Sequence, residues 1–274
     1  MKNAKLWKRI LHEGLAAYGE HLAVEIIQNA IAAAPIICCP TYSIELGKAR
    51  NFKDYSKLAV PFEKFWIERV VADTERSMLE GMFVASVKEK DWYALTVAEV
   101  LAADMHKPSL AVSWQFRIDA AGGLVMHGPD QVAIQMLFAR DDMADDQTTN
   151  EIRTATLDLC DMLSLLSCKN IDLASRDLGL SNREKRHAEK RGASAGFRYH
   201  VLTVRPAGSK PGTPGEEIGN MPRHVCRGHF AEYGPEFNRG LLFGKYAGRF
   251  YIPPHMKGDA KNGVVKKDYE VAHA

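Results

Sequence analysis

The sequence predicts an α+β fold: an antiparallel sheet body flanked by helices, followed by a small β-rich C-terminal region. Three patterns indicate this class. Apolar residues recur at helical spacing near the N-terminus, β-branched and aromatic residues dominate residues 82–138, and short strand patterns alternate with Gly/Pro-rich loops from residue 196 onward. A chain of 274 residues suits one large domain or two modest ones.

Two helices are predicted to open the body, because apolar residues there recur every three or four positions and so share one helical face. The first face holds Trp7, Ile10, Leu11, Leu15 and Tyr18, and the second holds Leu22, Ile26, Ile27, Ala30 and Ile31. Pro35 and Pro40 then enclose residues 36–39. A proline lacks the amide donor and biases its predecessor toward extended geometry, so we expect a buried extended segment there.

A further helix is expected over Leu58–Glu68. Pro61 stands where proline favours the start of a helix, and Phe62, Phe65 and Trp66 would line its inner face. Beyond it the pattern changes to that of strands, which predicts an antiparallel meander with a hairpin turn at Gly122-Gly123. The predicted strands are Met82–Val87, Trp92–Val97, Leu110–Ile118 and Gln131–Phe138.

The body is predicted to end with a helix that covers the sheet. Thr148-x-x-Glu151 has the pattern of a capping box, and apolar residues follow it at helical spacing. We therefore divide the chain into an acidic α+β body over residues 1–176, a polar linker or exposed helix over 177–195, and a basic β-rich tail over 196–274. The predicted tail strands are Phe197–Arg205, His224–Tyr233, Arg249–Ile252 and Val264–Val271.

Charge is distributed unevenly along the chain. The net charge is +2, yet residues 183–274 carry 17 Lys+Arg against 9 Asp+Glu. A basic segment with interleaved aromatic residues suits phosphate backbones or acidic protein surfaces, although it can also be a solvated face without a ligand. The tail is therefore where we look for function.

Several classes of protein are not favoured. No apolar stretch is long enough for a secretory signal or a membrane span, and five cysteines form no disulfide pattern, which predicts a cytoplasmic protein with reduced thiols. The sequence has no phosphate-binding P-loop, no nucleophile elbow and no His-Glu-x-x-His motif. The scattered histidines His12, His21, His106 and His127 are expected to be structural or exposed.

The tail segment 223–233 supports two interpretations as a chemical centre. His224, Cys226, His229 and His255 could ligate zinc, but their spacing matches no known zinc pattern, so we predict no metal and no cofactor. Alternatively, His224 and His229 could act as base and acid of a metal-independent ribonuclease, with Arg227 stabilising the phosphorane.

A recognition surface requires the fewest assumptions about the geometry of these residues, because charge-assisted donors beside flat rings can bind RNA or a peptide. The opposing interpretation is that the rings form a small core and the arginine stems cover it. The candidate binding residues are Arg223, His224, Arg227, His229, Phe230, Tyr233, Lys245, Tyr246, Arg249 and Tyr251.

The tail also resembles a known family. The pattern consists of His224-x-x-Arg227-Gly-His229-Phe230-x-x-Tyr233, Leu242-Phe-Gly-Lys-Tyr-x-Gly248, a strand ending in Pro254-His255, and Gly263-x-Val265-x-x-Asp268-Tyr269. It resembles the C-terminal region of a family of bacteriophage and prophage proteins. Its His-x-x-Arg-Gly-His-aromatic core is also similar to that of the type V-A anti-CRISPR protein that lowers production of its target nuclease. Where that protein has a second arginine, this chain has Cys226.

The resemblance implies a mobile-element protein of the host bacterial cytoplasm that suppresses a CRISPR immune nuclease. Such a protein would recognise the nascent peptide of the nuclease and promote loss of its mRNA during translation. Its partners would be a host protein or nascent peptide of a CRISPR effector, together with ribosome or mRNA, and no membrane. The residues favour a binding protein over an enzyme without excluding catalysis. A metal-independent ribonuclease and a non-catalytic RNA-binding accessory protein stay open as alternatives.

Overall fold

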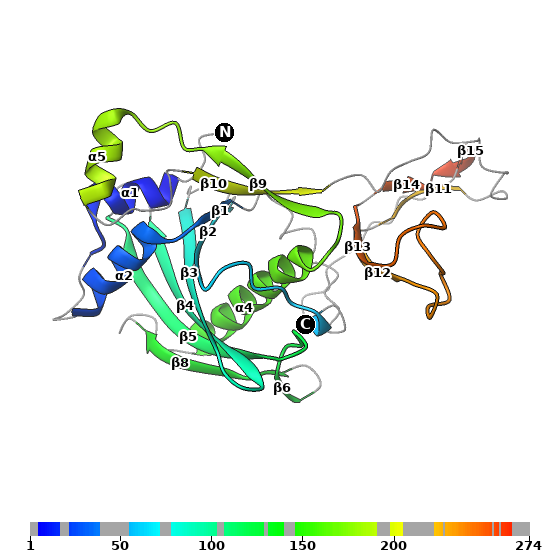
Figure 1. Ribbon diagram of the computed structural model, residues 1–274, viewed down its shortest axis with the longest axis horizontal. Helices are drawn as coiled ribbons and strands as arrows, with labels where there is room; N and C mark the ends of the chain where they lie inside the picture. The colour runs from blue at the N-terminus through cyan, green and yellow to red at the C-terminus, as the bar shows by residue number, and fades with distance from the viewer. Residues whose placement is uncertain are drawn as a thin grey trace. The chain divides into compact units, whose positions relative to one another are not determined.

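The computed structural model divides into two compact units (Figure 1). Unit 1 comprises Met1–Ser167 and Ile171–Thr203, and unit 2 comprises Cys168–Asn170 and Val204–Ala274. The residues described are 5–16, 22–38, 55–71, 78–102, 107–128, 131–139, 146–190, 198–204, 222–226, 228–253, 255–257 and 259–264.

Unit 1 is built on an eight-stranded mixed sheet with the strand order β8-β5-β4-β3-β2-β1-β10-β9. Its strands are β1 (Ile36–Cys38), β2 (Lys64–Val71), β3 (Met78–Lys88), β4 (Trp92–Ala102), β5 (Ser109–Asp119), β8 (Ile134–Ala139), β9 (Ile171–Asp177) and β10 (Arg198–Val204). The short strands β6 (Met126–Gly128) and β7 (Gln131–Val132) pair with each other. The helices are α1 (Lys5–Glu13), α2 (Leu22–Ala33), α4 (Asp146–Leu166) and α5 (Asn182–Lys190).

The predicted α+β class is confirmed. Strands β2, β3, β4, β5 and β8 pair antiparallel in that order, as the meander requires. Strand β1 confirms the extended segment between the two prolines, but it runs parallel to both of its neighbours, β2 and β10, which makes the sheet mixed. Strand β10 lies within the predicted tail and yet belongs to this sheet.

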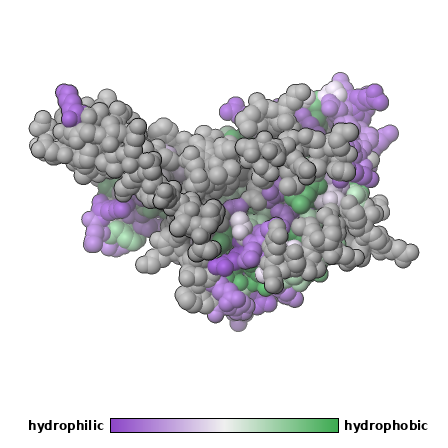
Figure 2. All heavy atoms as spheres, turned by 180° about the vertical axis from the view of Figure 1, so that it is seen from behind, coloured by the Kyte–Doolittle hydropathy of each residue, from purple (hydrophilic) through white to green (hydrophobic). Residues whose placement is uncertain are grey.

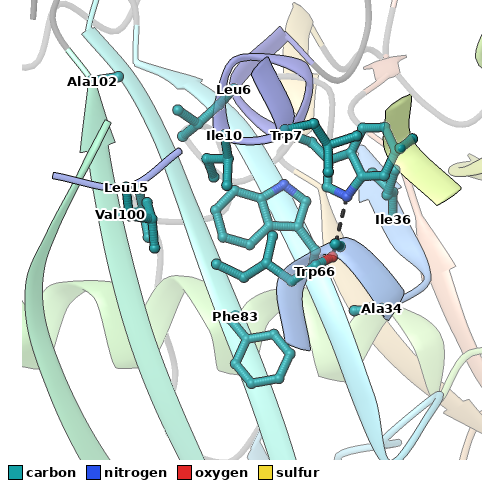
Figure 3. Packing of buried hydrophobic residues seen from close by; sticks show 14 of the residues in the cluster. Leu6, Trp7, Ile10, Leu15, Ala34, Ile36, Trp66, Phe83, Val100 and Ala102 are labelled. Carbon is teal, nitrogen blue, oxygen red and sulfur yellow. Dashed lines mark hydrogen bonds between the residues drawn. The ribbon is translucent and has the colours of Figure 1, made fainter. Parts of the chain in front are cut away.

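One face of the sheet packs against α1 and α2 (Figure 3). Trp66 on β2 lies at the centre of this layer and is fully buried, next to Ile10 of α1 and Phe83 of β3. The indole of Trp7 donates a hydrogen bond to the carbonyl of Ile31, which links the two helices at 3.2 Å. The predicted face of the first helix is confirmed for Trp7, Ile10 and Leu11, which are buried; Leu15 is buried beyond the end of α1, and Tyr18 lies outside the described residues. Ile26 of the predicted α2 face is 64% exposed.

A buried carboxylate on the sheet caps helix α1. The amides of Leu6 and Trp7 donate to Glu68 Oε1 and Oε2 at 2.8 and 3.1 Å, and Glu68 is only 6% exposed. The first amides of a helix lack partners within it and carry its positive end, so an anion there is stabilising. Helix α1 has no acidic residue in its own first turn, and Glu68 supplies one from 62 residues away.

The opposite face of the sheet is covered by α4, which crosses behind the strands in Figure 3. Most side chains of this helix are buried, including Ile152, Leu159 and Leu163. A hydrogen bond links the segment around residue 55 to α4, because the Tyr55 hydroxyl donates to Asp161 at 2.7 Å. The helix begins at Asp146, so Thr148 lies inside its first turns and is not its N-cap.

The predicted helix over Leu58–Glu68 is wrong, because residues 64–71 form strand β2. This strand lies inside the sheet, and Phe65, Trp66 and Ile67 are all buried by helices on both faces. A strand covered on both faces loses the alternation of apolar and polar residues, so its apolar run cannot be told from a helical one by period.

Unit 2 contains two small groups of strands. Strand β12 (His229–Tyr233) pairs antiparallel with β13 (Gly248–Ile252), and β11 (Pro222–Cys226) pairs with β14 (His255–Lys257) and β15 (Asp259–Val264). The predicted single strand His224–Tyr233 is therefore two strands.

Among the described helices, none is both long and apolar enough to cross a membrane.

Candidate functional site

The candidate site is built on the β12–β13 hairpin of unit 2. Its register places Phe230 opposite Tyr251, Ala231 opposite Phe250 and Glu232 opposite Arg249. Because strand side chains alternate, Phe230, Arg249 and Tyr251 share one face, while His229 and Tyr233 lie on the other. The hairpin therefore divides the predicted site residues between two surfaces.

The first face is a small core. The Arg249 guanidinium lies 4.5 Å from the centre of the Phe230 ring, and Phe230 and Tyr251 are tilted rings with centroids 5.6 Å apart. Arg249 is 5% exposed and Tyr251 is 1% exposed. Here the structure supports the interpretation in which an arginine covers the rings, so these two side chains are not available to a ligand surface.

The segment Cys168–Asn170, which belongs to unit 2, completes this core. The side chain of Asn170 accepts from the Tyr251 amide at 2.9 Å and donates to the Tyr251 carbonyl at 2.7 Å, and the Lys169 amide donates to the Arg249 carbonyl at 2.9 Å. These bonds run along β13 as those of a third strand would. Lys169 also crosses Gly248, where a Cβ atom would lie 2.7 Å from the Lys169 side chain.

The second face carries His229 and Tyr233. Tyr233 packs edge-on against Phe250 with centroids 5.8 Å apart, whereas His229 is exposed at the start of β12. Arg227 lies outside the described residues. For Arg223, His224, Cys226 and His255 the structure describes the backbone alone, which pairs Cys226 with His255 and His224 with Lys257.

The β12–β13 loop (residues 234–247) holds the exposed part of the site. Lys245 and Tyr246, both predicted from the sequence, are exposed, and Tyr246 is 52% exposed. Three further large apolar residues of this loop are also exposed, and none of them is among the binding residues predicted from the sequence. They are Phe237 at 38%, Leu241 at 39% and Phe243 at 51%.

The loop is held by its own backbone. The Gly234 amide donates to the Gly240 carbonyl at 2.9 Å, and Leu242 and Tyr246 exchange two hydrogen bonds of 2.9 and 3.1 Å. Leu242 is buried and anchors the loop. Surface loops whose ends are close and whose backbone is bonded internally are frequently functional.

Phe243 adopts an uncommon backbone conformation, with a φ of 53°. The left-handed region costs an L-residue roughly 1–2 kcal/mol, and a bulky side chain there is unusual. Glycines at 240, 244 and 248 supply the other left-handed positions of the segment. Their four-residue spacing, with rings between them, is the sequence signal that could have identified this loop.

The loop combines apolar rings with cations. Arg239 and Lys245 are exposed among the four apolar side chains. In Figure 2 this part of unit 2, at the left, shows green and purple residues next to each other. Large apolar side chains exposed together on one ordered loop suit an interaction site, and rigid rings contribute contact area at little entropic cost.

Among the described residues, no group of three or more His, Cys, Asp or Glu is arranged to hold a metal ion. No protein-family model, curated protein or solved structure matches the chain.

Proposed function

We propose that unit 2 is a recognition module whose β12–β13 loop binds a peptide segment of a partner protein. The observation that carries the proposal is the loop itself, which exposes Phe237, Leu241, Phe243 and Tyr246 in a conformation fixed by backbone hydrogen bonds. A preformed loop loses little conformational entropy on binding. Arg239 and Lys245 suit a peptide that carries carboxylates.

Within this proposal, the partner is the nascent peptide of a host CRISPR nuclease, and binding during translation leads to loss of the nuclease mRNA. The resemblance of the tail to bacteriophage proteins and to the type V-A anti-CRISPR protein supports this choice. Part of that resemblance, Leu242-Phe-Gly-Lys-Tyr-x-Gly248, coincides with the loop that exposes the rings. The protein then acts by binding, without catalysis or cofactor, in the bacterial cytoplasm.

Phe243→Gly tests the proposal, because glycine removes the ring and adopts a positive φ without strain. The substitution should leave the thermal stability nearly unchanged, while truncation of a central aromatic contact should weaken peptide binding about 30-fold. The measurement is a pull-down of translating ribosomes with the tagged full chain from cells that express the nuclease. Enrichment of the nuclease message should disappear with Phe243→Gly.

Phe243→Tyr is the matched control, because it keeps a ring at the same position and should preserve the enrichment. Equal enrichment of the nuclease message by wild type and Phe243→Gly would contradict the assignment of the loop. If wild type enriches no nascent chain of any kind, peptide recognition itself is wrong.

The ribonuclease alternative requires a different result. Cleavage of bare RNA by the purified chain, insensitive to chelator and abolished by His229→Ala, would favour a metal-independent enzyme. His229 is the one motif histidine whose side chain the structure describes, and it is exposed. Salt-sensitive RNA binding without cleavage and without peptide capture would favour the accessory protein.

A further inference from the structure

Helix α5 of unit 1 carries a row of cations that the proposed function does not use. Arg183, Arg186 and Lys190 are exposed, and at 3.6 residues per turn they fall within about 60° around the helix axis. Ala188, on the opposite side of the helix, is 1% exposed and belongs to the core that includes α1. We call Arg183, Arg186 and Lys190 the α5 cation row.

The fold holds this row in place. The Ser181 and Glu184 side chains form a capping box at the start of α5, with the Ser181 amide donating to Glu184 at 2.7 Å and the Glu184 amide donating to the Ser181 hydroxyl at 3.3 Å. The rings of His187 and His12 stack at 5.3 Å between α5 and α1. The Lys8 ammonium donates to the carbonyl of Leu178 just before α5, at 3.1 Å.

No acidic group of the described chain forms an ion pair with the row, and Glu189, exposed three residues after Arg186 on the same helix, is the nearest carboxylate along α5. Glu184, the acidic residue in the first turn, is engaged in the capping box. Within the described ranges, Arg183, Arg186 and Lys190 form no ion pair or hydrogen bond, while Arg9 and Glu13 on α1 pair with each other at 3.0 Å. The cations thus present their charge to solvent without an ion-pair partner from these ranges.

The surface along the row is hollowed. A concavity of about 340 Å³ is lined by the three cations together with Asn182 and His187. In Figure 2, hydrophilic residues gather at the upper right, over α5. All five lining side chains carry N–H donors, while the wall exposed inside the hollow consists mainly of their carbon atoms.

The chemistry of the row selects its ligand. The sole apolar side chain of α5 is the buried Ala188, so the helix offers neither the apolar face of a membrane-surface helix nor the apolar anchor of a protein interface. Two guanidinium groups bind phosphate oxygens in a bidentate way. From Arg183 to Lys190 the helix rises about 10 Å, enough to follow successive phosphates of an extended strand.

We infer that the α5 cation row binds the phosphate backbone of single-stranded RNA. The choice of RNA rests on the proposed function, which takes place during translation. The contacts are to phosphates, so binding is independent of base sequence and sensitive to salt. Unit 1 then contributes RNA affinity while unit 2 contributes recognition of a partner.

The test uses the full chain with a fluorescent single-stranded RNA oligonucleotide, and binding is followed by anisotropy across a salt series. For single strands the slope of log K against log salt changes by about 0.7 per phosphate contact, so Arg183→Gln/Arg186→Gln/Lys190→Gln should reduce its magnitude by about 2. Glutamine favours helix, so α5 should remain folded. The charge-preserving variant Arg183→Lys/Arg186→Lys should keep the wild-type slope.

The matched control removes three exposed lysines elsewhere in unit 1, with Lys64→Gln/Lys88→Gln/Lys90→Gln. It changes the net charge equally and should keep the wild-type slope. An unchanged slope in the α5 variant would overturn the inference, as would tighter binding to DNA of the same sequence. Equally tight, α5-dependent binding of polyglutamate would overturn it in favour of an acidic protein partner.

Failure here is distinguishable from failure of the proposed function. The α5 variant should still capture the partner peptide, and Phe243→Gly should still bind RNA with the wild-type salt slope. Loss of both activities in either variant would contradict the assignment of two separate surfaces.

Discussion

Unit 1 and unit 2 bury aromatic side chains by different means. In unit 1 a wide sheet has helices on both faces, so Trp66 and Trp114 are fully hidden between layers. In unit 2 the β12–β13 hairpin is two strands wide, and an isolated hairpin is at best marginally stable. The hairpin core therefore depends on a guanidinium over a ring and on the Asn170 side chain beside β13.

This difference helps to identify which exposed residues of unit 2 suggest a binding role. A small unit cannot bury everything, yet unit 2 hides Phe250 and Tyr251 while it leaves Phe243 and Tyr246 in a loop with its own hydrogen bonds. The buried and the exposed rings of unit 2 are equally apolar, so hydrophobicity does not distinguish them. The exposed rings lie in a loop with an ordered backbone and a left-handed residue, Phe243, and both features favour a binding role for the loop.

Gly81 tests how tightly the core of unit 1 is packed around Trp66. A Cβ atom at this position would lie 2.0 Å from the Trp66 ring, which has no exposed space to move into. Gly81→Ala should therefore destabilise unit 1 by about 3 kcal/mol, the upper range for overpacking a core. All four tryptophans lie in unit 1, so thermal unfolding followed by tryptophan fluorescence reports this unit.

Trp66→Phe supplies the matched test of the cause. If the clash is with the indole, the Gly81→Ala/Trp66→Phe double variant should lose less stability than the sum of the two single variants. Strict additivity, or a Gly81→Ala midpoint equal to that of wild type, would mean that the Trp66 ring does not require the glycine.

Asn170 is the corresponding point in unit 2. Asn170→Ala removes two buried hydrogen bonds and leaves the Tyr251 amide and carbonyl without them, which should cost about 2 kcal/mol. Hydrogen exchange of the Tyr251 amide measures the effect directly. Because unit 2 has no tryptophan, the fluorescence transition of unit 1 should stay where it is.

Asn170→Asp separates the two bonds, since a carboxylate still accepts from the Tyr251 amide but cannot donate to its carbonyl. Its exchange protection should lie between those of wild type and Asn170→Ala. Wild-type protection in both variants would show that β12 and β13 hold together without a third element.

Local patterns predicted much of the fold. The Gly122-Gly123 turn is confirmed, with the Gly122 amide donating to the Asp119 carbonyl at 3.0 Å, and so are the two N-terminal helices. What failed depends on partners far away in sequence. Strand β2 was not predicted because burial on both faces removes the alternation of apolar and polar residues. No local signal indicates that Glu68 caps a helix 62 residues earlier.

The candidate site could be predicted only in part, because the positions of some of its side chains also depend on contacts that are distant in sequence. Lys245 and Tyr246 are exposed as a recognition surface requires, but Arg249 is buried because the packing of Phe230 decides its place. Asn170 lies 81 residues from Tyr251, so its role follows from the fold alone. Phe237 and Phe243 were missed because an apolar side chain is ordinarily expected to be buried.

The exposed capping box of α5 should contribute less to stability than the buried hydrogen bonds of Asn170. The hydrogen bond from the Ser181 side chain, with that from the Ser181 amide, holds the pKa of Glu184 below its ordinary value of 4.5. A lowered carboxyl pKa means that the cap contributes stability above the unfolded pKa and loses it as pH falls through the folded pKa. Hydrogen-exchange protection of the Glu184 amide should therefore fall in acid, while that of the Tyr251 amide should not follow the same titration.

Ser181→Ala should raise the NMR titration midpoint of the Glu184 carboxyl toward 4.5, and an identical midpoint in wild type and variant would show that the capping box does not form.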